Sequence, residues 1–585
     1  MRLIHYSRLI TTLTLILSVI LTGCATRVYT PPYRPDMFAD QTPATIEGLY
    51  TALNQNFPQY RNVTYSTPRI NYLPSNWIIQ TPDAWGETIS DYNDGLKPAS
   101  GQQFNRDYQA PSCNSDADCH AGRKCTRANF AQTSLCLGPA NNFQQRMYNL
   151  IANAKSFVDI TTLQPTDKRQ FTMTTDAFTT TLKNAIVALA YKSQTSTHPI
   201  YVRLLQGSFT PARDKDKDRA RALKILVQNQ HAYLVNIVKA LPQNNKLVIS
   251  IASQRSCAFM RPGNCGNINK QHSLYFSAAW NHGKIIDVDG KSLIVGGENL
   301  WGNDYLGKNP VNDMNIEITG PVAAGAVDYV NHLWQFVYIH QNKLRSNICH
   351  TYDYQTGRIS KKCPDIFPTS NAQTASASGL PVKAMYVAKL NNGVLDKDAD
   401  QSEFARVYAF GHAKQSIKIS QQALIQKFDR RQLYPLYAVN GTVMQALAHA
   451  VKTGVTVDIV TSNLSPNQKG YSSEVGAQAI YDYLLHLLTA QFGLKESMAK
   501  AALRQYLHIK TVAYAANDRD ASKTSSHNKM WIVDDHLFYV GSHNIYPSSL
   551  QQFGVIIDDQ QATNLLEQQW WQPLWRNAVV ANYHH

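Results

Sequence analysis

The chain has 585 residues, 44% of them hydrophobic, and a formal net charge of +15 at neutral pH. This length suffices for two domains with complete cores, and beyond the N-terminus no segment is long and apolar enough to span a bilayer, which excludes a chain built on several membrane helices. The basic charge suits anionic lipid, nucleic acid or plain solubility equally, so it selects no partner by itself.

The first 23 residues have the pattern of a bacterial export signal. Two arginines precede an apolar run, residues 10–21, which is too short for a stable membrane-spanning helix. The sequence Leu-Thr-Gly-Cys that ends at Cys24 resembles a lipobox, which implies cleavage before this cysteine and its diacylation. Ala25 follows, where Asp would favour the inner membrane, so we expect the outer membrane or the cell surface. The alternative is an ordinary cleaved signal with an incidental cysteine.

The mature chain begins with a tether and a first lobe. Residues 24–44 are rich in Pro and Tyr and are expected to lead away from the membrane. We place the first lobe at residues 45–368. Within it, residues 91–142 are polar and contain Gly, Asn and four cysteines, which indicates a small disulfide-stapled module.

Apart from Cys24, the cysteines form three local sets. Their even number in an exported chain predicts disulfides. We expect the pairs Cys257–Cys265 and Cys349–Cys363. Zinc is the competing interpretation, but the CxxC spacing of common structural zinc sites is absent, so we expect no metal. The remaining set, whose pairing the sequence leaves open, is Cys113, Cys119, Cys125 and Cys136.

Helical and extended patterns alternate along the first lobe. Residues 175–193 have apolar side chains at helical spacing, and residues 201–205 and 247–251 read as strands. This alternation predicts α/β packing. A stretch rich in Ser, Thr and Ala, residues 369–379, is expected to link the first lobe to a second one, residues 380–585.

The second lobe repeats the alternation. Residues 416–420 and 455–460 read as strands, and residues 480–503 as one amphipathic helix. A final helix is expected at residues 562–571, and Pro573 should end it. Three tryptophans near its end suit either a membrane-interface patch or packing on a sheet, which we prefer; they are Trp570, Trp571 and Trp575.

Two copies of one motif, at identical internal spacing, carry the functional signal. In each copy a His is followed by Lys at +2, Asp at +7, Gly at +14 and Asn at +17. Five matched positions in two places indicate an internal repeat. The copies are His282, Lys284, Asp289, Gly296 and Asn299, and then His527, Lys529, Asp534, Gly541 and Asn544.

Each copy reads as a β-hairpin whose His and Lys project from one face, because residues two apart on a strand share a face. Asp289 and Asp534 have the opposite parity and are expected to hold the turns. If the copies face each other, one imidazole can attack phosphorus while the other protonates the leaving oxygen. The Lys and Asn side chains would then bind the phosphate oxygens. No step requires a cofactor. The alternative interpretation, that the histidines are buried structural residues, suits a single HxK sequence better than a matched pair of motifs.

The paired motifs resemble the HKD motifs of the phospholipase D superfamily. Longer stretches around them (residues 280–306 and 527–557), with residues 77–87, 158–165 and 312–324, resemble the secreted phospholipases D of Streptomyces. The resemblance runs from about Thr45 to the C-terminus with insertions, of which residues 91–142 form one. It implies a pseudo-twofold fold of two αβα lobes that each give one motif to a shared cleft.

The resemblance also implies a reaction. The expected activity is hydrolysis of phosphatidylcholine-type lipids to phosphatidic acid and a free alcohol, with transfer of the phosphatidyl group to other alcohols. In the family the first His is the nucleophile and the second the general acid and base, which implies these roles for His282 and His527. The symmetry of the motifs alone leaves the roles open.

Two positions depart from the family pattern. Gly297 stands where many relatives have Ser. The family also has an acidic residue downstream of each motif that bonds the far ring nitrogen of the His. Asp313 fills this place for the first motif, but Gln552 stands there for the second. We therefore expect the pKa of His527 to be lower than in relatives.

The expected partners are a phospholipid membrane or micelle as substrate and water or a small alcohol as acceptor. We expect a monomer that does not act on nucleic acid. The alternatives are an HKD nuclease, a phosphatidyltransferase of the cardiolipin synthase kind, and a catalytically silent lipid-binding lipoprotein. The intact His, Lys and Asn sets argue against the last of these.

Overall fold

A computed structural model of the protein describes residues 42–120, 122–164, 174–208, 217–256, 279–341, 347–369, 378–390, 394–395, 400–428, 436–464, 471, 473, 475–548 and 550–583. The predictions for the export signal, Cys24, most of the tether, the Cys257–Cys265 pair and most of the linker lie outside these ranges. Within them, no helix has the length and apolar character needed to cross a membrane.

The first lobe contains a mixed sheet with the order β14-β13-β9-β8-β7-β10-β11-β12-β2, in which only β7, β8 and β9 run parallel to one another. The strands are β2 (Ile78–Thr81), β7 (Phe157–Leu163), β8 (Ile200–Gly207), β9 (Leu247–Gln254), β10 (Ile285–Val288), β11 (Ser292–Gly296), β12 (Val311–Thr319), β13 (Cys349–Asp353) and β14 (Arg358–Ser360).

The second lobe has the order β25-β20-β19-β16-β22-β23-β24-β15-β1. Its run β16-β22-β23-β24 reproduces β7-β10-β11-β12 of the first lobe, so the repeat seen in the motifs extends to the topology. The strands are β1 (Arg69–Leu73), β15 (Leu380–Lys389), β16 (Ser416–Gln421), β19 (Thr456–Thr461), β20 (Leu507–Thr511), β22 (Lys529–Val533), β23 (Leu537–Gly541), β24 (Gln552–Asp558) and β25 (Val579–Val580).

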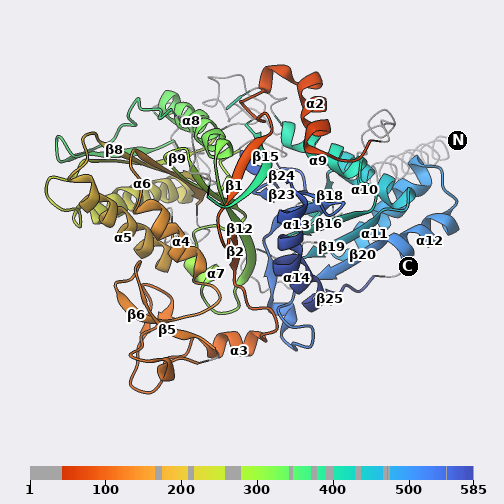
Figure 1. The fold of residues 1–585 in the computed structure, drawn as a ribbon, viewed down its shortest axis with the longest axis horizontal. Coiled ribbons are helices and arrows are strands. Elements are labelled where there is room, and N and C mark those ends of the chain that lie inside the picture. The colour runs from red at the N-terminus through yellow and green to blue at the C-terminus, as the bar shows by residue number, and fades with distance from the viewer. Residues whose placement is uncertain are drawn as a thin grey trace, which may run out of the picture.

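Helices cover the outer face of each sheet, and a third group fills the space between the sheets (Figure 1). Both faces of each sheet are therefore buried, which explains why the central strands are apolar at successive positions. The outer helices of the first lobe are α4 (Asn142–Ile151), α5 (Asp176–Ser193) and α6 (Lys217–Val238); those of the second are α9 (Gln401–Gly411), α10 (Gly441–Lys452), α11 (Ala477–His486) and α12 (Glu496–Tyr506); the inner ones are α8 (Pro321–His340), α13 (Gln560–Leu566) and α14 (Gln572–Asn577).

The lobes also exchange backbone hydrogen bonds at the point where the two motifs meet. Asn312 of β12 pairs in parallel with Ser526 of the short strand β21 (Ser525–Ser526), and Asn281 forms an equivalent bridge with Gln551. His527 directly follows Ser526, and His282 directly follows Asn281. The opposite lobe therefore holds each motif histidine in register.

The N-terminal helix α2 (Ile46–Asn56) corrects the predicted boundary of the first lobe at residue 45. Its buried Leu49 and Leu53 belong to the core of the second lobe, and the backbone N–H of Ile46 donates to a carboxylate oxygen of Asp558 at 2.8 Å. The next strand, β1, also extends the second sheet. The described part of the chain therefore starts on the second lobe and crosses to the first lobe at β2.

Most predicted elements are present, and two helices differ from the prediction. The strands and the helix at residues 175–193 are found, with Thr175 as the N-cap. The predicted helix at 480–503 is two helices, because Gly493 adopts a left-handed φ of 70° between α11 and α12. Pro573 lies in the first turn of α14, where its missing N–H costs little, and helical structure continues to Asn577. Trp570 and Trp571 are buried, as the packing interpretation predicts.

The cysteine-rich module has a small core of its own and contains the short helix α3 (Ile89–Asp94) and the hairpin of β5 (Lys124–Ala128) and β6 (Thr133–Leu137). Its disulfides are Cys113–Cys125 and Cys119–Cys136, and the predicted Cys349–Cys363 disulfide is also present. The side chain of Asn184 on α5 donates to the backbone oxygen of Phe130 at 2.8 Å, which fixes the module to the first lobe.

Candidate active site

The two motif histidines lie face to edge at the junction of the lobes. The ring centroids of His282 and His527 are 6.3 Å apart with an interplanar angle of 75°, and both side chains are buried. A phosphorus atom at near-attack distance from one ring, ~3–3.5 Å, would place its leaving oxygen within hydrogen-bond reach of the other, ~2.6–3.2 Å. The apposition that the sequence repeat predicts is therefore present.

The motif lysines lie beside the histidines because they project from the same face of the same strand. Lys284 Nζ donates to the backbone oxygen of His282 at 2.7 Å, and Lys529 Nζ donates to that of His527 at 2.5 Å. This repeated contact fixes each ammonium group next to its own imidazole. Both lysines are buried, so their remaining protons face the space between the rings or other protein atoms.

The motif asparagines provide two further polar groups. Asn299 and Asn544 follow β11 and β23 and are buried, and neither side-chain amide makes a hydrogen bond of good geometry within the described residues. An unpartnered buried amide is costly unless a ligand or water completes it. Both amides are therefore suited to hold phosphate oxygens.

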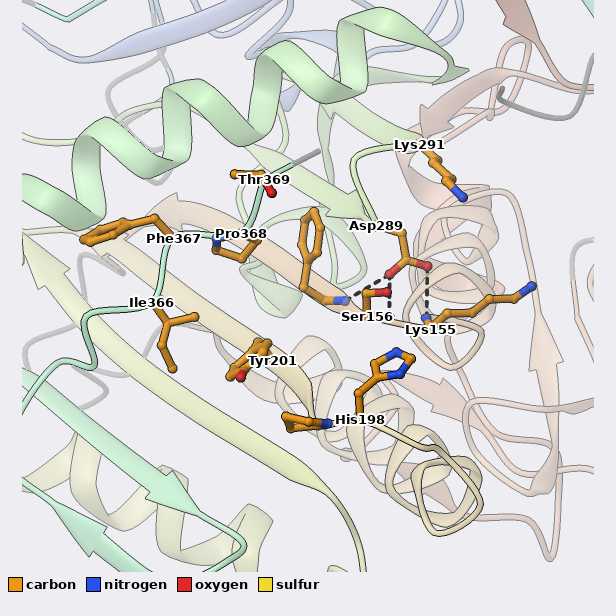
Figure 2. Close-up of a pocket in the computed structure, with 12 residues that line it drawn as sticks. Lys155, Ser156, His198, Tyr201, Asp289, Lys291, Ile366, Phe367, Pro368 and Thr369 are labelled. Atoms are coloured by element: carbon orange, nitrogen blue, oxygen red, sulfur yellow. Dashed lines mark hydrogen bonds between the residues drawn. The ribbon is translucent and has the colours of Figure 1, made fainter. Parts of the chain in front are cut away.

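The motif aspartates hold backbone, as their parity predicts. Figure 2 shows the carboxylate of Asp289 accepting hydrogen bonds from the backbone N–H groups that lead into β7, with N–O distances of 2.7–2.9 Å. Asp534 accepts three equivalent N–H groups before β16. Both residues have a left-handed φ, 59° and 51°, which Asp tolerates better than most residues. The pocket of about 510 Å³ drawn in Figure 2 lies at this end of β7, whereas Thr161, near the other end, donates its hydroxyl to the backbone oxygen of Gly283 beside His282.

The far ring nitrogen of His527 is bonded by an acid from the other lobe. Its Nδ1 lies 2.8 Å from Asp313 Oδ2 and 3.1 Å from the hydroxyl of Tyr305, which itself donates to the same carboxylate oxygen at 3.1 Å. Asp313 is therefore the partner of the second motif. The prediction that Asp313 is the partner of His282 is wrong, because β12, which carries Asp313, pairs with β21, the strand that directly precedes His527.

Within the described ranges, the corresponding nitrogen of His282 meets no carboxylate. Its Nδ1 lies 3.1 Å from the backbone oxygen of Ser542, and the side-chain amide of Gln552 donates to the same oxygen at 3.1 Å. Gln552 therefore acts on the first motif, and the predicted effect of this residue on the pKa of His527 is corrected. A carbonyl only accepts, so Nδ1 of His282 carries the proton and Nε2 carries the lone pair.

A steric constraint explains why position 297 is a glycine. A Cβ at this position would lie 2.1 Å from Asp313 Oδ1 and 2.8 Å from the backbone oxygen of His527. Any side chain here would displace the carboxylate that orients His527. Gly297, which stands where many relatives have Ser, is thus the residue that makes room for the carboxylate of Asp313.

Burial and positive charge shift the pKa values of the whole group. Burial lowers the pKa of His282 and His527 well below their usual value, and the nearby lysines lower them further. Burial lowers the pKa of Lys529 to about 7, with Asp313 opposing it, and raises the pKa of Asp313 to about 7. Burial and Lys529 lower the pKa of Lys284. An anion that enters this group favours the protonated forms.

Two tyrosines belong to the site although no sequence signal marks them. Tyr305, on the short helix α7 (Gly302–Tyr305), bridges Asp313 and His527, and the ring of Tyr471 lies 4.8 Å from that of His527. Trp301, beside the first motif, is buried and donates its indole N–H to the backbone oxygen of Leu163 at 3.1 Å. Tyr471 comes from a segment without a motif, so only the fold could reveal it.

Comparisons with known proteins find similar sequences and structures. The family model "Cardiolipin synthase, PLD-like domain" matches residues 408–575. A phospholipase D of Streptomyces antibioticus is 23% identical over 590 residues, which cover 93% of this chain and 90% of that protein. A crystal structure of phosphatidylserine synthase from Haemophilus influenzae is similar with 15% identity and a TM-score of 0.43, covering 75% of this chain and 85% of that one. Nuc of Salmonella typhimurium, described as a phospholipase D family member, is 17% identical with a TM-score of 0.20 and covers 31% of this chain and 90% of its own.

The duplicated sheets and the apposed His–Lys–Asn sets define a phosphodiesterase with a two-histidine centre. Together with the family-model match over residues 408–575 and the similarity to the Streptomyces phospholipase D, they support membership of the phospholipase D superfamily. The three disulfides found among the described residues are typical of a protein that folds in an oxidising compartment.

Proposed function

We propose that the protein is a phospholipase D, which hydrolyses the phosphodiester between a phosphatidyl group and its head-group alcohol. The observation that carries this proposal is the 6.3 Å apposition of His282 and His527, with two buried lysines and two buried asparagine amides beside them. The similarity to a phospholipase D over 93% of the chain supports the choice of a lipid diester.

In the first step, Nε2 of His282 attacks phosphorus and the bond from phosphorus to the head-group oxygen breaks. His527 gives its Nε2 proton to that oxygen, and the alcohol leaves. Charge on the two non-bridging oxygens is stabilised by Lys284, Lys529 and the amides of the two motif asparagines. The product of this step is a phosphatidyl group bonded to His282.

In the second step, His527 takes a proton from water as the water oxygen attacks phosphorus. The bond from phosphorus to Nε2 of His282 breaks, and its electron pair returns to the ring. Phosphatidic acid leaves, and both histidines regain their starting protonation. The proton gained by His527 restores the acid needed for the next cycle.

The unequal partners of the two rings support this division of roles. Asp313 stabilises a protonated His527, as a general acid requires, whereas Ser542 offers His282 only a neutral carbonyl, which favours the unprotonated nucleophile. This agrees with the roles that the family resemblance implies.

The acceptor in the second step is not restricted to water by any group described above. We therefore propose that small primary alcohols also accept the phosphatidyl group, and that the natural substrate is presented in a membrane or micelle by a monomeric enzyme. Ethanol added to the assay would yield phosphatidylethanol at the expense of phosphatidic acid.

The test is choline release from phosphatidylcholine micelles, with a duplex and a single-stranded DNA assayed in parallel, all in the presence of EDTA. We expect choline release that His282→Ala and His527→Ala each reduce by at least about a thousandfold. His508→Ala is the control, because this ring lies half exposed on the second lobe and pairs only with Asp458 within the described residues. DNA cleavage without choline release would instead identify a nuclease.

We also propose that Cys24 is diacylated and anchors the mature chain to the outer membrane. The lipobox-like sequence and the disulfide-containing fold support export. Labelling with radioactive palmitate in a bacterial host should mark the wild type and leave Cys24→Ala unlabelled. Equal labelling of both would remove this proposal.

A further inference from the structure

Asp313 and Gln552 occupy equivalent places in the internal repeat. The motif glycines Gly296 and Gly541 pair with residues 315 and 554 on the following strand. Each of those strands contributes, two residues earlier, one of the two side chains in question. Each of these two side chains follows a backbone bridge between the lobes, which places it near the histidine of the opposite lobe.

The two histidines nevertheless have different surroundings at Nδ1. A backbone carbonyl lies beside each ring, from Gly297 for His527 and from Ser542 for His282, and each raises the pKa of its histidine. Among the residues that the structure describes, only His527 also has a carboxylate, at 2.8 Å. At His282 the amide of Gln552 donates to the same neutral carbonyl, so the ring and the amide share one uncharged acceptor.

The two motifs also differ at the residue that lies beside Asp313 or Gln552. Gly297 leaves the space that the Asp313 carboxylate fills, since a Cβ there would lie 2.1 Å from Oδ1. The equivalent residue of the second motif is Ser542, whose side chain is present and donates its hydroxyl to the backbone oxygen of Phe553 at 3.1 Å. Each histidine therefore has its own matched pair of residues near Nδ1: Gly297 with Asp313 at His527, and Ser542 with Gln552 at His282.

Given the proposed phospholipase D reaction, we infer that Gln552 is a positioning residue that keeps the covalent intermediate short-lived. Phosphorylation at Nε2 of His282, while Nδ1 keeps its proton, places a positive charge on the ring. A carboxylate at Nδ1 would stabilise this charge, but the carbonyl shared with Gln552 does so less, since charge-assisted hydrogen bonds are about twice as strong as neutral ones. The phosphatidyl group on His282 is thus a more reactive donor to water or alcohol.

The test introduces, next to His282, the Gly–Asp pair that is found next to His527. The variants are Ser542→Gly with Gln552→Asp, which transplants the Gly–Asp pair, and Gln552→Asp alone. The matched control carries Ser542→Gly with Gln552→Asn, because Asn has the shape of Asp without its charge. A soluble short-chain phosphatidylcholine is mixed with each enzyme, the reaction is quenched in alkaline denaturant, and intact-protein mass measures the covalently occupied fraction.

We expect a low occupied fraction in the wild type and about a tenfold higher ratio of occupied to free enzyme in the Asp variants than in the Asn control. Choline should appear in a burst in the Asp variants only. In the Asp variants, the acidic limb of the pH profile of kcat/KM should also move to higher pH, because a carboxylate raises the pKa of His282 against the opposing Lys284, Lys529 and His543.

Equal occupancy in the Asp and Asn variants would overturn the inference. A wild type that is mostly occupied during turnover would overturn it too, and this measurement needs no variant to fold. Failure of the proposed function looks different, because then the wild type releases no choline at all.

Discussion

The Nδ1 atom of His527 lies 2.8 Å from a carboxylate oxygen of Asp313, although the two residues come from different lobes. Both lobes must therefore be in register before His527 is oriented for its proposed roles as general acid in the first step and general base in the second. The parallel pairing of Asn312 with Ser526 provides that register. The site is thus a property of the interface between the lobes and not of either half.

Asp313→Asn should lower kcat/KM for phosphatidylcholine by about a hundredfold or more, because the imidazolium of His527 loses its counter-charge. The loss should be several-fold at most for a phosphatidyl ester of p-nitrophenol, whose leaving oxygen needs little protonation. Steady-state kinetics with the two substrates measures the difference. An equal loss for both would mean that Asp313 acts through structure alone.

Gly297→Ser should nearly abolish choline release, since the new Cβ overlaps the carboxylate of Asp313. Gly476→Ala is the control, because its Cβ would meet only the flexible tip of Leu464 at 3.2 Å. The activity of both proteins, compared at equal folded fraction by circular dichroism, checks this. Full activity of Gly297→Ser would show that the carboxylate can move without consequence.

Binding of sulfate should weaken as the pH rises from about 6 to about 8. Burial places the pKa of Lys529 and of Asp313 at about 7, so above this pH the lysine loses its positive charge and the carboxyl gains a negative one. Both changes disfavour an anion. Isothermal titration calorimetry at several pH values measures the effect, and sulfate keeps its own charge throughout. Tighter binding at the higher pH would contradict the shifts.

Asp289→Ala and Asp534→Ala should each lower the free energy of unfolding by about 2–4 kcal/mol, because three backbone N–H groups lose a charged acceptor. Asp91→Ala, at the exposed start of α3, should cost less, about 1 kcal/mol. Urea unfolding measures all three. Loss of activity without loss of stability would instead assign the motif aspartates to chemistry.

The sequence predicted what local spacing determines. The repeated motif, its hairpins, the side of each strand that carries His and Lys, and the turn role of Asp289 all follow from parity within a few residues. The helix at residues 175–193 follows in the same way from its apolar spacing, and the structure contains it as α5.

The rest depends on contacts between distant segments. The assignment of Asp313 to the wrong histidine arose because 214 residues separate it from His527, and only the pairing between the lobes brings them together. The docking of α2 on the second lobe has the same origin. Gly493, a left-handed residue inside an amphipathic pattern, divides a predicted helix that the apolar spacing alone presents as continuous.

The most direct test of the account is to identify the atom that carries the phosphatidyl group. His527→Asn removes the acid and the base, so a p-nitrophenyl ester can still react at the first step while the second step is blocked. Peptide mass spectrometry after alkaline quenching should then find the adduct on His282, with one equivalent of nitrophenol released per enzyme. An adduct elsewhere, or continued turnover with no adduct, would contradict the account.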